Sequence, residues 1–138
     1  MRSLFGTDGI RGRAGEYPLD PATVSRIGAA LAVSLRDRGR TGTLTVVVGC
    51  DTRVSSPVIV SALAGGLMAA GATVRFAGVV PTPAVAHLVK ALGADAGISV
   101  SASHNPWPDN GIKIFSWEGR KLPDAVDPAP YLGRPVPP

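Results

Sequence analysis

The alternation of short apolar runs with amphipathic segments is the feature that most constrains how this chain can fold. Runs rich in β-branched residues occur at positions 44–48, 73–77 and 96–100. Segments with apolar residues at helical spacing open at Pro21, Pro57 and Pro83 and close before Gly39, Gly71 and Gly93. Strands that alternate with helices of this length pair in parallel through right-handed crossovers. The sequence therefore predicts an α/β fold, a three-layer α/β/α sandwich around a mixed, mostly parallel sheet.

Local signals define the ends and the packing of these helices. Asp20 and Ser56 each precede a proline, so both are predicted to cap the helix that follows. Gly71 is placed to end the second helix. Within that helix, the adjacent Gly65 and Gly66 predict a close approach of a neighbouring element.

Composition excludes several classes of protein. The 138 residues correspond to one domain, with 45% hydrophobic and 17% charged residues, which argues against disorder. The net charge of +4 is scattered along a chain with few aromatic residues, so a nucleic-acid partner is not favoured. No apolar run reaches transmembrane length, and glycine and aspartate interrupt the first nine residues too early for a signal peptide. We therefore expect a cytoplasmic protein without a membrane partner, and the single Cys50 predicts a buried thiol and no disulfide within the chain.

The last part of the chain departs from the βα pattern. Residues 111–115 and 120–122 flank a glycine-containing turn, which predicts two strands joined by that turn. Six of the 13 prolines fall within residues 123–138, where no apolar periodicity remains. We expect a domain at residues 1–122 followed by a disordered, proline-rich tail at 123–138.

Each predicted parallel strand ends in a polar loop, and ligands gather beyond the carboxyl ends of such strands. The loop at 101–106 reads SASHNP and suggests a reactive serine. A serine hydrolase is not favoured, because the sequence has no G-x-S-x-G elbow. The glycine-rich fingerprints of nucleotide-binding sites are also missing. The third hypothesis is a serine that carries a phosphate. Backbone N–H groups, Asn105 and a nearby cation such as Lys113 could hold that phosphate.

Five motifs in the same order resemble the α-D-phosphohexomutase family, and together they cover about residues 2–122. They are FGTDGIRG at 5–12, DTR at 51–53, PTPA at 81–84, ADAGISVSASHNPWPDNGIKIF at 94–115 and GRKL at 119–122. Within the family, the first motif and the SASHNP followed by DNGIK are most similar to the bacterial members that act on glucosamine phosphate. The resemblance implies conversion of glucosamine 6-phosphate to glucosamine 1-phosphate through a phosphoserine and a bisphosphorylated sugar.

The resemblance also implies roles for particular residues. Ser103 matches the serine that carries the phosphoryl group, and Lys113 matches the family's candidate acid/base. His104 and Asn105 match the same loop and would position the phosphate, while Arg11 matches a cation that faces it. The expected ligands are a hexosamine phosphate and a sugar bisphosphate. For Arg53 and Asp51, an ion pair at the helix entrance and a contact with substrate both remain open.

A magnesium ion is expected as well, because in the family an oxygen of the phosphate on Ser103 is one of its ligands. The other ligands belong to an aspartate-rich D-G-D-x-D-R loop in the second of the family's four domains, and this sequence has no such loop. We therefore expect the first domain of a mutase, a natural fragment or the product of an interrupted reading frame, that is inactive without the other mutase domains. The alternatives are a free-standing domain that binds sugar phosphates or a partner, and a mutase acting on glucose or mannose phosphates.

Overall fold

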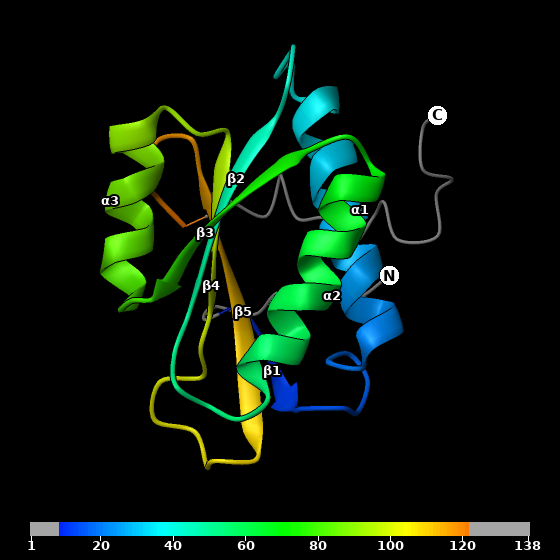
Figure 1. Ribbon diagram of the computed structural model, residues 1–138, viewed down its shortest axis with the longest axis vertical. Helices are drawn as coiled ribbons and strands as arrows, with labels where there is room; N and C mark the ends of the chain where they lie inside the picture. Colours follow the sequence, from blue (N-terminus) through cyan, green and yellow to red (C-terminus); the bar gives the residue numbers. More distant parts are fainter. Residues whose placement is uncertain (1–8, 122–138) are drawn as a thin grey trace.

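The structure of the protein, a computed structural model, describes residues 9–121 (Figure 1). The expectations for residues 1–8, for a boundary at residue 122 and for the tail at 123–138 lie outside this range. Within it, a five-stranded sheet is covered by helices on both faces, as expected for a three-layer α/β/α sandwich.

The sheet is mixed, and its strand order is β1-β5-β4-β2-β3. The strands are β1 (Ile10–Arg13), β2 (Thr45–Cys50), β3 (Thr73–Val79), β4 (Ala96–Val100) and β5 (Asp109–Ser116). β2 pairs in parallel with both β3 and β4, whereas β5 runs antiparallel to its neighbours β4 and β1. Four strands thus share one direction and β5 is reversed, which confirms a mixed, mostly parallel sheet.

Three helices form the outer layers. α1 (Pro21–Asp37) and α2 (Ser56–Ala69) pack against each other on one face of the sheet, and α3 (Thr82–Leu92) covers the other face (Figure 1). The larger core lies beneath α1 and α2, where leucine and isoleucine side chains such as Leu31, Leu63 and Ile98 are fully buried against β2 and β4. A smaller cluster beneath α3 contains Val47 and Val89.

The predicted helix ends are partly correct. The carboxylate of Asp20 accepts a hydrogen bond from the Thr23 N–H at 3.1 Å, which confirms its capping role. Gly71 has a φ of +87° directly after the last turn of α2, as the sequence predicts. The prediction for Ser56 is wrong, because Ser55 occupies the cap position and Ser56 is the first helical residue. The Ser56 hydroxyl does not accept from a helix N–H as a cap would; it donates to the carboxylate of Asp51 at 2.8 Å.

The close contact between α1 and α2 depends on glycine. A β-carbon at Gly66 would overlap the carbonyl oxygen of Ser25, and one at Gly28 would press on the carbonyl oxygen of Leu63. By contrast, a β-carbon at Gly65 would meet no atom within 4 Å. Of the two adjacent glycines, only Gly66 therefore serves the helix packing.

Two elements differ from the prediction. β1 was not expected, because Ile10–Arg13 contains a single apolar residue and forms a strand only by pairing with β5. The second strand of the predicted terminal hairpin is reduced to an isolated bridge between Phe115 and Lys121, and Leu122 lies outside the described residues. The turn itself is present, with the Ser116 N–H donating to the Arg120 carbonyl at 2.8 Å.

A salt bridge lies at the end of the sheet where β2 and β4 begin. Arg40 Nε lies 2.8 Å from Asp95 Oδ1, and the other carboxylate oxygen accepts the Thr45 N–H at 2.8 Å. The Arg40 guanidinium also lies over the ring of Trp117, 4.8 Å from its centroid. Among residues 9–121, no helix combines the length and the apolar character needed to cross a membrane.

Candidate functional site

The polar loops meet at the opposite end of the sheet, where β2 and β4 finish and β5 begins, at the bottom of the view in Figure 1. The loop after β2 starts with Asp51, whose N–H donates to the Val100 carbonyl at 3.0 Å and so continues the β2–β4 pairing. The loop at 101–108 follows β4 and returns into β5. This topology brings the DTR motif and the SASHNP motif side by side.

Ser103 lies at the exposed tip of the loop after β4. It has a φ of 51°, and it is the only non-glycine residue in the described part of the chain with a positive φ. Its N–H donates to the Ser101 hydroxyl at 3.2 Å. The Ser103 hydroxyl accepts a hydrogen bond from Lys113 Nζ at 3.2 Å. The structure thus brings together the two residues expected to carry the phosphate and to move a proton.

Arg11 and Asn105 also meet at this site. Arg11 extends from β1, and its Nη1 donates to Asn105 Oδ1 at 3.1 Å, while Asn105 Nδ2 donates to Asp109 Oδ2 at 3.3 Å. The Nε of Arg11 is buried without a partner among residues 9–121. His104 lies next to Ser103 with an exposed side chain. All five residues expected from the sequence therefore lie in or beside one loop, and their roles there remain predictions.

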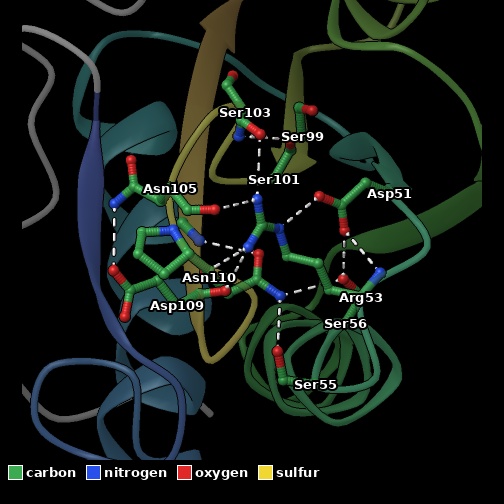
Figure 2. Close-up of polar contacts among 12 residues, drawn as sticks. Asp51, Arg53, Ser55, Ser56, Ser99, Ser101, Ser103, Asn105, Asp109 and Asn110 are labelled. Atoms are coloured by element: carbon green, nitrogen blue, oxygen red, sulfur yellow. Dashed lines mark hydrogen bonds and ion pairs between the residues drawn. The ribbon is translucent and has the colours of Figure 1, made fainter.

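Arg53 holds the inner side of this loop. Its side chain is only 6% exposed, and Figure 2 shows its guanidinium at the centre of a set of polar contacts. Arg53 Nε lies 3.0 Å from Asp51 Oδ2. The terminal nitrogens donate to four backbone carbonyls of the loop, those of Ser103 (3.1 Å), Asn105 (3.0 Å), Pro106 (2.7 Å) and Asp109 (3.1 Å). One side chain thus connects the end of β2 to the whole loop after β4.

Asn110 secures the return of the loop into β5. It is fully buried, and its side-chain amide donates to the hydroxyls of Ser55 at 2.9 Å and Ser56 at 3.0 Å. The Ser56 hydroxyl in turn donates to Asp51 Oδ1 at 2.8 Å. The first turn of α2, the DTR loop and the start of β5 therefore form one hydrogen-bonded network (Figure 2).

Two groups at this end of β2 have shifted pKa values. Burial raises the pKa of Asp51, but hydrogen bonds from Ser56, Arg53 and Ser101 outweigh burial and leave this pKa below its ordinary value. Burial, assisted by the charge of Asp51, raises the pKa of the Cys50 thiol. The carboxylate therefore stays ionised as a partner for Arg53, and the thiol stays protonated and buried, as the sequence predicts.

Arg53 and Asn110 have a larger part in the site than the sequence indicates. The loop carbonyls that Arg53 contacts and the hydroxyls that Asn110 contacts lie fifty or more positions away along the chain, so spacing could not reveal them. The DTR motif is the sequence signal for Arg53, and it is compatible with two roles, an ion pair with Asp51 and a contact with substrate. The ion pair with Asp51 is present, and it is accompanied by the carbonyl contacts.

Two further features mark the limits of the site. Among the described residues, no group of three or more His, Cys, Asp or Glu side chains could hold a metal ion. A largely apolar groove of about 610 Å³ lies between α2 and β3 and is lined by Cys50, Asp51, Thr52, Arg53, Pro57, Val60, Ser61, Phe76 and Val79. Ser103 is not among the lining residues, although Asp51 and Arg53, which contact its loop, are.

Comparison with known proteins agrees with this architecture. Residues 2–129 match the family described as phosphoglucomutase/phosphomannomutase, alpha/beta/alpha domain I. The crystal structure of a phosphoglucomutase/phosphomannomutase family protein from Burkholderia thailandensis superposes with a TM-score of 0.76 at 33% identity, over 94% of this chain and 29% of that one. The Paramecium phosphoprotein pp63/parafusin, at 20% identity and a TM-score of 0.75, shares the fold. The chain belongs to the phosphoglucomutase/phosphomannomutase family.

The curated relatives give the resemblance more detail. The chain is 56% identical over 127 residues to the phosphoglucosamine mutase of Koribacter versatilis, and the match covers 92% of this chain and 27% of that protein. It is 52% identical over 126 residues to the phosphoglucosamine mutase of Pseudomonas putida, and the match covers 91% of this chain and 28% of that protein. The chain thus spans little more than a quarter of the length of these relatives. Both relatives are named as sugar-phosphate mutases.

Proposed function

We propose that this chain is the α/β/α domain of a phosphoglucosamine mutase and that Ser103 carries the phosphoryl group. The observation that supports this most directly is the position of the Ser103 hydroxyl, which lies at the exposed tip of a loop at the carboxyl end of β4 and accepts a hydrogen bond from Lys113 at 3.2 Å. The similarity to phosphoglucosamine mutases over nine-tenths of the chain supports the choice of substrate class.

The proposed chemistry is the transfer of a phosphoryl group between Ser103 and a hexosamine phosphate. When a bisphosphorylated hexosamine charges the domain, a bond forms between Ser103 Oγ and phosphorus while the bond from phosphorus to the sugar oxygen breaks. The serine hydroxyl loses its proton and the sugar oxygen gains one, and Lys113 is placed to relay a proton between them. Transfer from phosphorylated Ser103 to glucosamine 6-phosphate is the reverse of this step at the other sugar oxygen. Transfer of the original 6-phosphate from the resulting bisphosphate to Ser103 then leaves glucosamine 1-phosphate and restores the phosphorylated serine.

Charge and positioning account for most of the catalysis in such reactions. Lys113 supplies a positive charge beside the Ser103 hydroxyl, and Arg11 supplies a second through its contact with Asn105. His104 is adjacent to the serine and is proposed to help position its phosphate. In the proposed reaction, magnesium would stabilise the charge on the phosphate. An oxygen of phosphorylated Ser103 would be one ligand, and the remaining ligands would come from outside the described residues.

The proposal is tested by charging the chain with phosphate. The purified chain is incubated with hexosamine 1,6-bisphosphate, digested and mapped by mass spectrometry. Phosphate is expected on Ser103 of the wild-type chain and of the Ser101→Ala control, and on neither residue of the Ser103→Ala variant. Phosphate found on Ser101 and never on Ser103 would refute the assignment.

The complete mutase reaction is proposed to require the other mutase domains, since the chain spans only 27–28% of its relatives. We expect no turnover when the chain alone is given glucosamine 6-phosphate, hexosamine 1,6-bisphosphate and magnesium. The same assay with glucose and mannose phosphates covers the alternative substrates. Turnover of any of the three by the chain alone would contradict the need for further domains. A cytoplasmic location, where sugar phosphates are metabolised, is part of this proposal.

A further inference from the structure

Arg53 is a buried cation close to the proposed phosphate site, yet it has no donor to offer a substrate. A guanidinium group has five N–H bonds, and all five are used: one on Asp51 and four on loop carbonyls. The side chain is only 6% exposed. A direct contact between Arg53 and a sugar phosphate would require the loop to give up these hydrogen bonds.

The partners of Arg53 differ from those of an ordinary structural arginine. Arg40, the comparable residue at the other end of the sheet, forms one ion pair and lies over an aromatic ring. Arg53 also has an ion pair and lies 5.8 Å from the centroid of the Trp107 ring, but it makes four additional hydrogen bonds to main-chain oxygens between positions 103 and 109. Its contacts are therefore directed at the path of the loop backbone.

The direction of these carbonyls fixes the direction of the neighbouring amides. The peptide bond between Ser103 and His104 is trans, and in a planar trans peptide the C=O and N–H bonds point in opposite directions. Because the Ser103 carbonyl points at the Arg53 guanidinium, the His104 N–H points away from it. The same reasoning applies to Pro106 and the Trp107 N–H. Arg53 thus draws carbonyls to the inner side of the loop and turns amide donors to the outer side.

We propose that Arg53 is a positioning residue, which holds the Ser103 loop with its carbonyls inward so that the His104 amide faces the phosphate carried by Ser103. This rests on the proposed function of Ser103. It also accounts for the left-handed backbone at Ser103, a conformation with φ of 51° that a serine adopts only where its surroundings impose it. Asp51 assists by keeping the guanidinium plane in place.

The experiment uses the full chain with phosphoserine incorporated genetically at position 103, so that the phosphate is present whether or not the chain can acquire it. The ³¹P signal of this phosphoserine is followed as a function of pH in the wild type, in Arg53→Lys and in Arg40→Lys. Arg53→Lys keeps the positive charge but cannot reach four carbonyls, and Arg40→Lys makes the same exchange at a distant ion pair.

In the wild type, we expect the second pKa of the phosphoserine to lie below about 6, its ordinary value, because amide donors favour the dianion. Arg53→Lys should return it toward about 6, and Arg40→Lys should leave it unchanged. Hydrogen exchange should accelerate at least about tenfold in Arg53→Lys, and not in Arg40→Lys, at the amides of Ser103 and Asn105, which donate to the Ser101 hydroxyl and the Ala102 carbonyl within the loop. Identical results in the two variants would overturn the proposal.

A second measurement needs no variant and covers the case in which Arg53→Lys fails to fold. In the wild-type phosphorylated chain, the amide proton of His104 should move downfield as the phosphate becomes a dianion, with the same midpoint as the ³¹P signal. An amide shift that does not follow the phosphate would overturn the proposal. Since the phosphate is installed, failure of hexosamine 1,6-bisphosphate to phosphorylate Ser103 would refute the proposed function without affecting this result.

Discussion

The ammonium group of Lys113 in β5 donates a hydrogen bond across 3.2 Å to the hydroxyl of Ser103, which lies ten positions earlier in the loop after β4. The contact exists because β5 runs antiparallel to β4, so Lys113 lies opposite Ser99 near the point where the loop leaves β4. Reversal of a single strand in an otherwise parallel sheet thus places a cation beside the serine.

Lys113→Met should therefore slow the phosphorylation of Ser103 while leaving the fold intact. General acid–base catalysis contributes about 100-fold or more, so the rate of charging by hexosamine 1,6-bisphosphate should fall by at least about that factor. The rate is measured by mass spectrometry over time. The matched control is Lys90→Met in α3, on the outer face of the domain, which should charge at the wild-type rate. A Lys113→Met variant that charges as fast as the control would exclude the proton relay.

The backbone of Ser103 predicts an unusual order of stability among variants that lack the hydroxyl. A φ of 51° costs a residue with a β-carbon about 1–2 kcal/mol, and glycine avoids this cost. Ser103→Gly should therefore have a free energy of unfolding about 1 kcal/mol higher than that of Ser103→Ala. Urea denaturation followed by circular dichroism measures the difference. Equal stability of the two variants would mean that the loop relaxes out of the left-handed region.

The adjacent glycines of α2 provide a matched pair of substitutions. Gly66→Ala would place a methyl group against the carbonyl of Ser25, so the helices must separate and the free energy of unfolding should fall by about 1–3 kcal/mol. Gly65→Ala meets open space and should raise it by up to about 1 kcal/mol, because alanine favours the helix. Thermal and urea unfolding of both variants give the comparison. If Gly66→Ala is as stable as Gly65→Ala, the α1–α2 contact is looser than described.

These examples show which parts of the fold are predictable from the sequence. The helices and the central strands were predicted because their signals, apolar periodicity and turn residues, are local. β1 was missed because Ile10–Arg13 carries no such signal and owes its strand conformation to β5, about a hundred residues later. The cap prediction for Ser56 is wrong for a related reason, since a local capping rule cannot foresee that the Ser56 hydroxyl donates to the carboxylate of Asp51.

The candidate site divides in the same way. Ser103 and Lys113 were found through the SASHNP and DNGIK motifs, and the structure brings them together. The contacts of Arg53 and Asn110 depend on the folding of β2 and α2 against a loop fifty or more positions away, and no spacing rule encodes such contacts. The role of a residue that positions a loop from a distant element is therefore harder to predict than the role of a residue within the loop motif.

Asp51 gives the loop network a defined dependence on pH. Burial raises its pKa, but hydrogen bonds from Ser56, Arg53 and Ser101 bring the pKa in the folded protein below the ordinary value of 3.8. A lowered pKa means that folding favours the ionised carboxylate. The resulting stabilisation is complete above the pKa of the unfolded chain and is lost as the pH falls through the lower pKa of the folded protein.

Asp51→Asn removes this ionisation and should reveal its contribution. The wild type should be more stable than Asp51→Asn at neutral pH, and the gap between their free energies of unfolding should narrow below about pH 4, the ordinary range for an aspartate. Glu118→Gln, in the turn at the far end of β5, is the matched control and should not reproduce this narrowing. Urea denaturation between about pH 7 and pH 3 measures each gap, in which the effects of the unchanged carboxylates cancel. A gap that stays constant over this range would show that the charge of Asp51 is not what secures Arg53 beneath the Ser103 loop.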